Sequence, residues 1–192
     1  MQLITDFKNI AIGSYKILQL QKEWCAYIGN SFKTFLIALS INLLAIPIWI
    51  FLVPDVAKNT SNLMPTQQAI IEVVLQVILV LSVYLMALAH RRQKKFALIY
   101  AGQTYATLLI TVILFAVEGF MRIYEGSLYA LDAPLFARGV LMLAAIWVVV
   151  AMSFVFKSAL KINAAISLLM ASVLLFILIA GELLLHMLLF AQ

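Results

Sequence analysis

Five long apolar stretches, separated by short polar connections, constrain this chain more than any other feature. They cover about residues 34–53, 69–89, 96–117, 139–156 and 162–182 or longer. Glu72 and Glu182 are the only charged residues within them. A helix needs about 20 residues to cross a hydrocarbon core of roughly 30 Å. Lipid offers the backbone no hydrogen-bond partners, so each crossing segment must be a helix. The sequence therefore predicts an all-α polytopic membrane protein with five transmembrane helices.

The composition agrees with a protein whose solvent is lipid. Hydrophobic residues make up 66% of the 192 residues and charged residues 11%, whereas soluble domains are about 45–50% apolar and about 25% charged. A single core of this size could not bury so much apolar surface. The length suits one membrane domain. We expect this domain to cover residues 32–192 and to follow a polar segment at residues 1–31.

Lys and Arg lie mostly on one side of the predicted bundle. Ten of the 13 fall in residues 1–33, 90–95 and 157–161, and three fall in the connections on the other side. Cytoplasmic loops carry an excess of Lys and Arg. The N-terminus is therefore predicted to be cytoplasmic, and the C-terminus, after an odd number of spans, to lie on the outer side.

The turn between the second and third spans makes the largest contribution to this asymmetry. It contains Arg91, Arg92, Lys94 and Lys95. A basic run in a soluble protein would suggest nucleic acid, but a tight turn between two spans leaves no docking surface, so no nucleic-acid partner is expected. Anionic headgroups can interact with such residues at about 1 kcal/mol each. These four side chains are candidate lipid-headgroup contacts.

Residues 1–31 are predicted to form an amphipathic cytoplasmic segment that does not cross the membrane. Apolar residues recur there at steps of three and four or small multiples of them, with polar residues between, which is the pattern of an amphipathic helix. An interruption is expected near Gly13 and Ser14. Two placements stay open: along the headgroup layer, or packed on the chain's own helices. Asn30 or Ser31 is expected to cap the first span.

The fifth span ends in a pair of ionisable residues, Glu182 and His186. They are four residues apart, so they share one helix face, and they are expected near the outer interface. Ionisable groups at membrane depth are costly and often functional. The pair could face a cavity as a proton, ion or metal ligand, or it could form a hydrogen bond that fixes the helix end. Two ligands are too few for a metal site.

The third span carries a second group of polar residues. The stripe consists of Tyr100, Thr104, Thr107 and Thr111, and it points toward Glu118 and Arg122 at the outer end of the span. Glu118 and Arg122 are spaced for an ion pair. The stripe could line a polar pathway, or it could make hydrogen bonds between helices, with Asn42 and Gln76 as the expected partners.

Several kinds of chemistry can be argued against. The single cysteine, Cys25, excludes an internal disulfide and a cysteine-based metal site. His90 and His186 are predicted on opposite sides of the membrane, so they cannot ligate one haem. The metalloprotease, hydrolase, P-loop and dinucleotide-binding motifs do not occur in the sequence. We therefore expect no catalytic residues, no cofactor and no metal.

The layout is similar to that of the Yip1-like integral membrane proteins, which have a cytoplasmic N-terminal segment, five spans and an outer C-terminus. The similarity covers residues 34–190 and is one of layout. The stretch AYIGNSFKTFLIALSINLLAIP, residues 26–47, also resembles the start of uncharacterised small inner-membrane proteins of alphaproteobacteria. Both resemblances imply a bacterial inner-membrane protein that binds partners or lipids and has no identified catalytic residues.

The sequence favours a non-enzymatic accessory, assembly or membrane-organising component. Its expected partners are the lipid bilayer and other membrane-protein subunits or a second copy of itself. The competing hypothesis is a small transporter or channel for an ion or small solute, working through the polar residues of the third and fifth spans. A lipid-active enzyme is a third possibility that lacks a constellation of catalytic residues. Convergence of the polar residues on one water-accessible cavity would favour transport.

Overall fold

The computed structural model describes residues 2–52, 64–123 and 133–190, and every regular element in these ranges is a helix. The chain divides into two compact units. Unit 1 comprises Met1–Ile28 and Gly102–Ala171, and unit 2 comprises Gly29–Ala101 and Ser172–Gln192. Two helices, α6 (Phe96–Ile123) and α9 (Ala164–Phe190), begin in one unit and end in the other.

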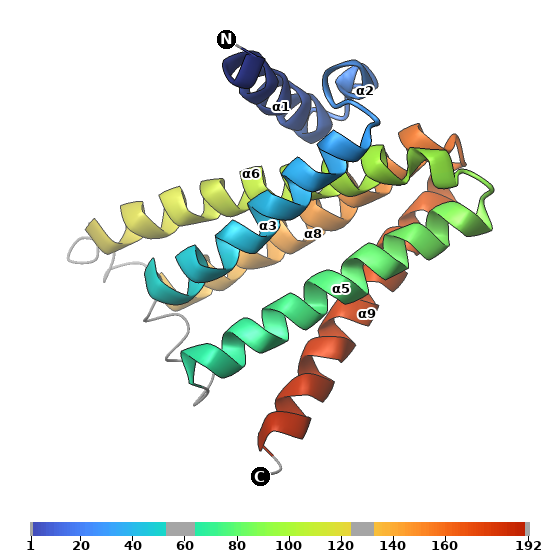
Figure 1. The fold of residues 1–192 in the computed structure, drawn as a ribbon. Coiled ribbons are helices and arrows are strands. Elements are labelled where there is room, and N and C mark those ends of the chain that lie inside the picture. The colour runs from blue at the N-terminus through green and yellow to red at the C-terminus, as the bar shows by residue number, and fades with distance from the viewer. Residues whose placement is uncertain (1, 53–63, 124–132, 191–192) are drawn as a thin grey trace. The chain divides into compact units, whose positions relative to one another are not determined.

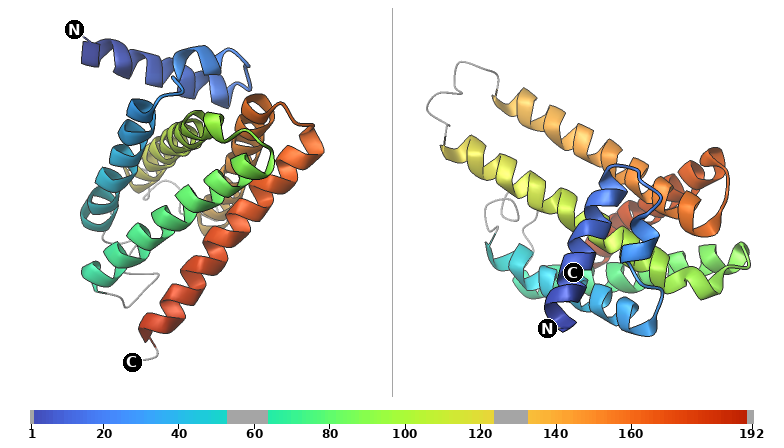
Figure 2. Two further views of the ribbon diagram at one scale, coloured as in Figure 1. Left: turned by 45° about the vertical axis from the view of Figure 1, so that its right-hand side comes forward. Right: turned by 90° about the horizontal axis from the view of Figure 1, so that it is seen from above.

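In unit 1, α6 runs beside α8 (Ala133–Leu160), and α1 (Gln2–Leu18) and α2 (Trp24–Tyr27) pack against this pair (Figures 1 and 2). Trp24 of α2 is fully buried, and its indole N–H donates to Ser158 Oγ at 2.8 Å. Gly102 of α6 makes room for the Trp24 ring, because a Cβ at Gly102 would lie 2.9 Å from Trp24 Cζ3. Trp24 therefore packs α2 against α6 and α8 within unit 1.

The expected interruption of the N-terminal helix near Gly13 and Ser14 is wrong, because α1 is continuous from Gln2 to Leu18. Gly13 is packed against α2, where a Cβ would lie 2.6 Å from Ile28 Cγ1. The Ser14 hydroxyl donates to the Ile10 carbonyl at 2.8 Å, within the helix. Gly13 thus serves close packing, and Ser14 bonds within the helix. The α1 helix ends just before Leu20, which takes a φ of 56°.

In unit 2, α3 (Phe32–Leu52) packs against α5 (Pro65–Ala89), and η1 (Gln93–Lys95) connects α5 to α6. The second part of α9 passes α5 (Figure 2). A Cβ at Gly181 would lie 3.4 Å from both Leu75 and Ile78 of α5. The core of this unit lies among α3, α5 and the first turn of α6, where Ala38, Val83 and Tyr100 are fully buried.

The helix starts follow the expected capping chemistry. Ser31 Oγ accepts from the Thr34 backbone N–H at 3.2 Å, so Ser31 caps α3 as one of the two expected residues. Pro65 occupies the first turn of α5, where its missing N–H costs nothing. Gln67 reaches back to accept from the Met64 backbone N–H at 2.9 Å. Asn163 caps α9 by accepting from the Ile166 N–H at 2.8 Å.

Four helices are long and apolar enough to cross a membrane, counted over the described residues. They are Pro65–Ala89, Gln93–Ile113, Met142–Leu160 and Ala164–Leu188. In α3, the stretch Phe32–Pro47 is apolar but shorter. The four helices fit an integral membrane protein. They correspond to the second to fifth predicted spans, and α6 continues past the predicted end of its span.

Candidate functional site

Tyr100 is the best-defined member of the predicted polar stripe. It is fully buried in unit 2, and its hydroxyl accepts from Asn42 Nδ2 of α3 at 2.9 Å. Its ring packs on Phe35 and Phe96, with centroids 5.2 and 6.1 Å away. The predicted pairing of the stripe with Asn42 is confirmed here. Tyr100 therefore lies in a closed aromatic contact between α3 and α6.

The remaining residues of the stripe belong to unit 1. Thr104 is buried, and Thr107 and Thr111 are half-buried. Next to them, Gln103 and Tyr105 are almost fully buried. Neither atom of the Gln103 amide nor the Tyr105 hydroxyl has a hydrogen-bond partner among the described residues. A buried polar group left unsatisfied costs about 1–3 kcal/mol, so the burial of these two residues is costly.

Gln76 was expected to pair with the stripe as Asn42 does. In the structure Gln76 Oε1 is buried and has no hydrogen-bond partner within the described part of the chain. The expected pairing of Gln76 with the stripe is not seen for this oxygen and stays a prediction.

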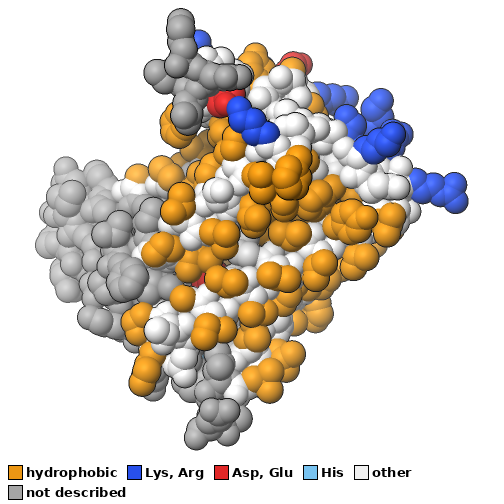
Figure 3. Space-filling view, viewed as in Figure 1, with side chains coloured by type: hydrophobic (Ala, Val, Ile, Leu, Met, Phe, Trp, Pro, Cys, Tyr) orange, Lys and Arg blue, Asp and Glu red, His pale blue; other side chains and the backbone are white. Residues whose placement is uncertain are grey.

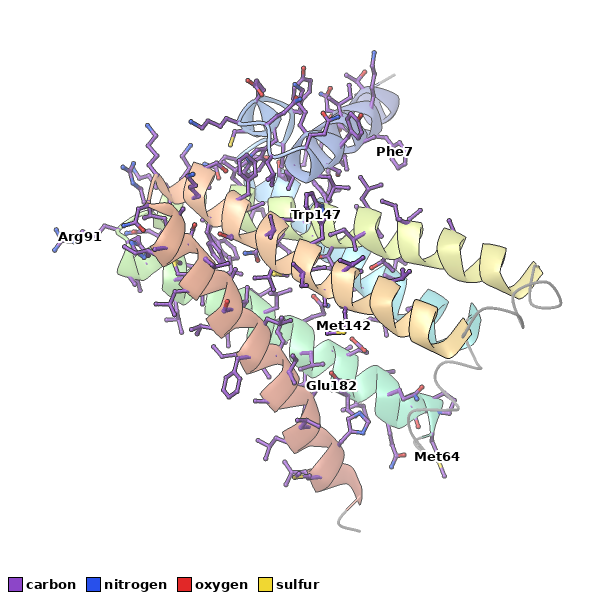
Figure 4. The ribbon with its side chains drawn as sticks, turned by 180° about the vertical axis from the view of Figure 1, so that it is seen from behind. Phe7, Met64, Arg91, Met142, Trp147 and Glu182 are labelled. Atoms are coloured by element: carbon purple, nitrogen blue, oxygen red, sulfur yellow. The ribbon has the colours of Figure 1, made fainter. Side chains whose placement is uncertain are left out.

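Glu182 of α9 lies near Glu72 of α5, and the two carboxylates interact electrostatically. Glu182 is exposed and Glu72 is half-buried. Figure 4 shows Glu182 where α9 passes α5, next to the close packing of Gly181 on that helix. His186 is half-buried one turn further along α9. Sequence reasoning selected Glu182 and His186 and left Glu72 out, because the two helices are far apart in the chain.

Glu118 and Arg122 were predicted to form an ion pair at the outer end of the third span. Both lie in the helical part of α6, but their side chains fall outside the residues that the structure describes. The pair stays a prediction.

The turn between α5 and α6 carries the four predicted headgroup contacts. Arg91, Arg92 and Lys94 are exposed and Lys95 is half-buried. Arg91 projects away from the helices (Figure 4), and basic side chains gather at this end of α5 (Figure 3). None of these four makes a salt bridge that the structure records within its described residues. Their placement leaves them available to an anionic ligand.

The described residues contain no group of three or more His, Cys, Asp or Glu side chains that could hold a metal ion. Glu72 and Glu182, which interact electrostatically, both lie in unit 2. Tyr100, by contrast, is engaged with Asn42 and the aromatic rings. In the structure, Tyr100 of the predicted stripe therefore has its hydrogen-bond partner on α3. Glu182 of the fifth predicted span has its electrostatic partner, Glu72, on α5.

Comparisons with protein-family models, with curated proteins and with solved structures find no match for this chain. The resemblance to Yip1-like proteins therefore stays a prediction, and the proposals below depend on the residues themselves.

Proposed function

We propose that this chain is a non-enzymatic integral membrane protein that acts as an accessory, assembly or membrane-organising component through lateral helix contacts. The observation that carries the proposal is an exposed face of α9 in unit 2 that combines large and small side chains. The face consists of Ser172, Phe176, Ala180, Leu183 and Met187, all exposed. These residues are spaced by three and four, so they share one side of the helix.

Small residues matter on such a face because helices in lipid gain little from burying apolar area. They associate through close packing, and small side chains let two backbones approach. Ser172 and Ala180 lie on either side of Phe176 and leave room around its ring, which is 72% exposed. We therefore assign the α9 face to a partner helix.

The exposed face of α5 has a different composition and serves as a comparison. Its members are Ile70, Val73, Val77, Leu81 and Leu88, all exposed. They span about five helical turns along one side, and they contain no small residue. Hydrophobic side chains cover the length of this helix in Figure 3. Bulky aliphatic side chains in this arrangement suit contact with lipid chains, so we assign this face to the bilayer.

The proposal includes the predicted topology. The 21 residues of α3 extend about 30 Å as a helix, which is enough for a fifth crossing. We propose an N-terminus in the cytoplasm and an outer C-terminus in a bacterial inner membrane. The α1 helix then lies at the cytoplasmic surface. Its exposed Phe7, Lys8 and Tyr15 face the headgroups, and Gly13 and Ile17 face the rest of unit 1.

Site-specific photocrosslinking tests the accessory role. A photoreactive residue at Phe176 is expected to yield a discrete protein adduct in membranes, and the same residue at Val77 of α5 is expected to yield lipid adducts. Mass spectrometry identifies the adducts. Lipid adducts at both positions, together with recovery of the chain as a monomer from mild detergent, would contradict the proposal.

The electrostatic interaction between Glu72 and Glu182 favours a small transporter or channel as the second candidate function. Two carboxylates that interact within apolar helices could carry a cation or protons. Purified protein in liposomes would then pass protons or monovalent cations, and Glu72→Gln would abolish the flux. Under the accessory proposal, the flux equals that of empty liposomes, and Glu72→Gln does not reduce the adduct at Phe176.

A further inference from the structure

Five cations gather at the end of unit 2 where α3 begins and α5 turns into α6. This basic cluster consists of Lys33, Arg91, Arg92, Lys94 and Lys95. Only Lys95 is partly buried, and the other four are exposed. The adjoining segments, residues 29–33 and 90–96, contain no Asp or Glu. The cluster therefore has a single sign of charge.

Asn30 holds the two parts of the basic cluster together. Its Nδ2 donates to the Lys94 carbonyl at 2.6 Å, and its Oδ1 accepts from the Leu98 backbone N–H at 3.2 Å. A few residues on, the rings of Phe35 and Phe96 pack with centroids 5.2 Å apart. The start of α3 is thus fastened to the turn, and Lys33 follows Asn30 by three residues.

Arg91 occupies a backbone position that usually belongs to glycine. Its φ is 55°. The Arg91 N–H donates to the Leu88 carbonyl and the Arg92 N–H to the Ala87 carbonyl, both at 2.8 Å. This is the Schellman pattern at a helix end, where the left-handed residue is most often glycine because a side chain strains that conformation. Leu20 takes the same conformation at the end of α1; at Arg91 the residue that takes it is a cation, and its side chain is exposed.

Two further features of this surface suit a phospholipid headgroup. Both α3 and α6 begin here, and the N-terminal ends of helices carry partial positive charge that favours anions. Phe32, next to Lys33, is 72% exposed. An apolar ring beside cations is typical of a surface that meets both the acyl chains and the phosphates of a membrane.

We propose that the basic cluster is a binding site for the phosphate headgroups of anionic phospholipids, ordered by Asn30 and by the strained Arg91. This site rests on the proposed membrane placement, and it does not depend on the partner assigned to α9. Phosphodiester headgroups fit because guanidinium groups form paired hydrogen bonds with phosphate oxygens.

Native mass spectrometry of the full chain in mild detergent tests the site, with phosphatidylglycerol and phosphatidylcholine as the probes. Removing one cation is expected to weaken binding about fivefold. R91Q/R92Q should therefore weaken phosphatidylglycerol binding about 30-fold and leave phosphatidylcholine binding unchanged. K22Q/K157Q removes the same charge from exposed positions outside the cluster and should change binding less than twofold. Equal losses in the two double variants would overturn the proposal.

Arg91→Gly separates binding from folding. It relieves the left-handed strain, so the protein should melt no lower than the parent, while phosphatidylglycerol binding falls about fivefold. Asn30→Ala keeps every charge and should also weaken binding, because the two parts of the cluster come apart. Unchanged affinity in Arg91→Gly would contradict the proposal. Displacement of the lipid by an equal concentration of inorganic phosphate would also contradict it, because the site would then be one for free phosphate. A failed crosslink at Phe176 would leave these results unaffected.

Discussion

Asn42 is a polar residue inside an apolar helix, and its amide has a defined partner, the Tyr100 hydroxyl at 2.9 Å. Hydrogen bonds between membrane helices average about 0.6 kcal/mol and reach about 1.7 kcal/mol in the strongest cases. The bond lies beside the Phe35 and Phe96 rings. Its contribution should therefore be measurable, and it should specify the register of α3 against α6.

A double-mutant cycle measures this bond. Asn42→Leu and Tyr100→Phe are each expected to lower the free energy of unfolding by about 1 kcal/mol. The double variant should lose less than the sum, because both substitutions remove the same interaction. Unfolding by sodium dodecyl sulfate in mixed micelles gives the free energies.

Tyr84→Phe is the matched control for this cycle. Tyr84 packs edge-on against Phe96, with centroids 5.7 Å apart, and its side chain is exposed. Removing its hydroxyl should change the free energy of unfolding by less than about 0.5 kcal/mol. Strict additivity of the Asn42 and Tyr100 substitutions would show that the two side chains do not interact.

The apolar lengths and the bordering charges were enough to locate four helices in the described part of the chain that are long and apolar enough to cross a membrane. The predicted start of the third span at residue 96 coincides with the start of α6, because Lys95 and the basic turn end the preceding segment. The error at Gly13 has a physical cause. Glycine is compatible with a helix break, but also with close packing, and a sequence alone does not say that Ile28 lies against that position.

Contacts between distant elements were beyond prediction for a related reason. Trp24 and Ser158 are 134 positions apart in the sequence. Glu72 and Glu182, which interact electrostatically, also lie far apart in the sequence. Helix order in a membrane depends on packing between small and large side chains, which a single sequence does not reveal. Asn42 could be matched with Tyr100 because both are polar residues within predicted spans. Gln103 and Tyr105 gave no signal of their unpaired burial.

Glycine substitutions test the packing of α1 directly. Gly13→Ala places a Cβ 2.6 Å from Ile28 Cγ1, so we expect a loss of about 1–3 kcal/mol in the free energy of unfolding from overpacking. Helix propensity offsets at most about 1 kcal/mol of this. Limited proteolysis should cut α1 faster in the variant.

Gly139→Ala serves as the control, because no described atom beyond its chain neighbours and its own helix backbone lies within 4 Å of a Cβ at Gly139. It should be neutral or should stabilise the protein by up to about 1 kcal/mol. If both alanine variants behave alike in unfolding and in proteolysis, the contact between α1 and α2 does not exist in the membrane protein.

The proposed topology of the whole molecule has five crossings, and it places the basic turns in the cytoplasm. Four helices have the length and composition for a crossing, and α3 supplies the fifth only if its 21 residues traverse the bilayer. The direction of every helix then follows from one fact, the side on which the turn containing Arg91 and Lys94 lies. The headgroup site and the outer position of Glu182 both depend on it.

Substituted-cysteine labelling in intact cells tests this claim most directly. Cys25 is the single native cysteine, so Cys25→Ser gives a clean background for Ser61→Cys, Gln93→Cys and Lys161→Cys. A membrane-impermeant maleimide should label the cysteine at 61 in intact cells, and it should label those at 93 and 161 only after the cells are opened. Labelling of positions 93 and 161 from outside, or protection of position 61 together with them, would contradict the account.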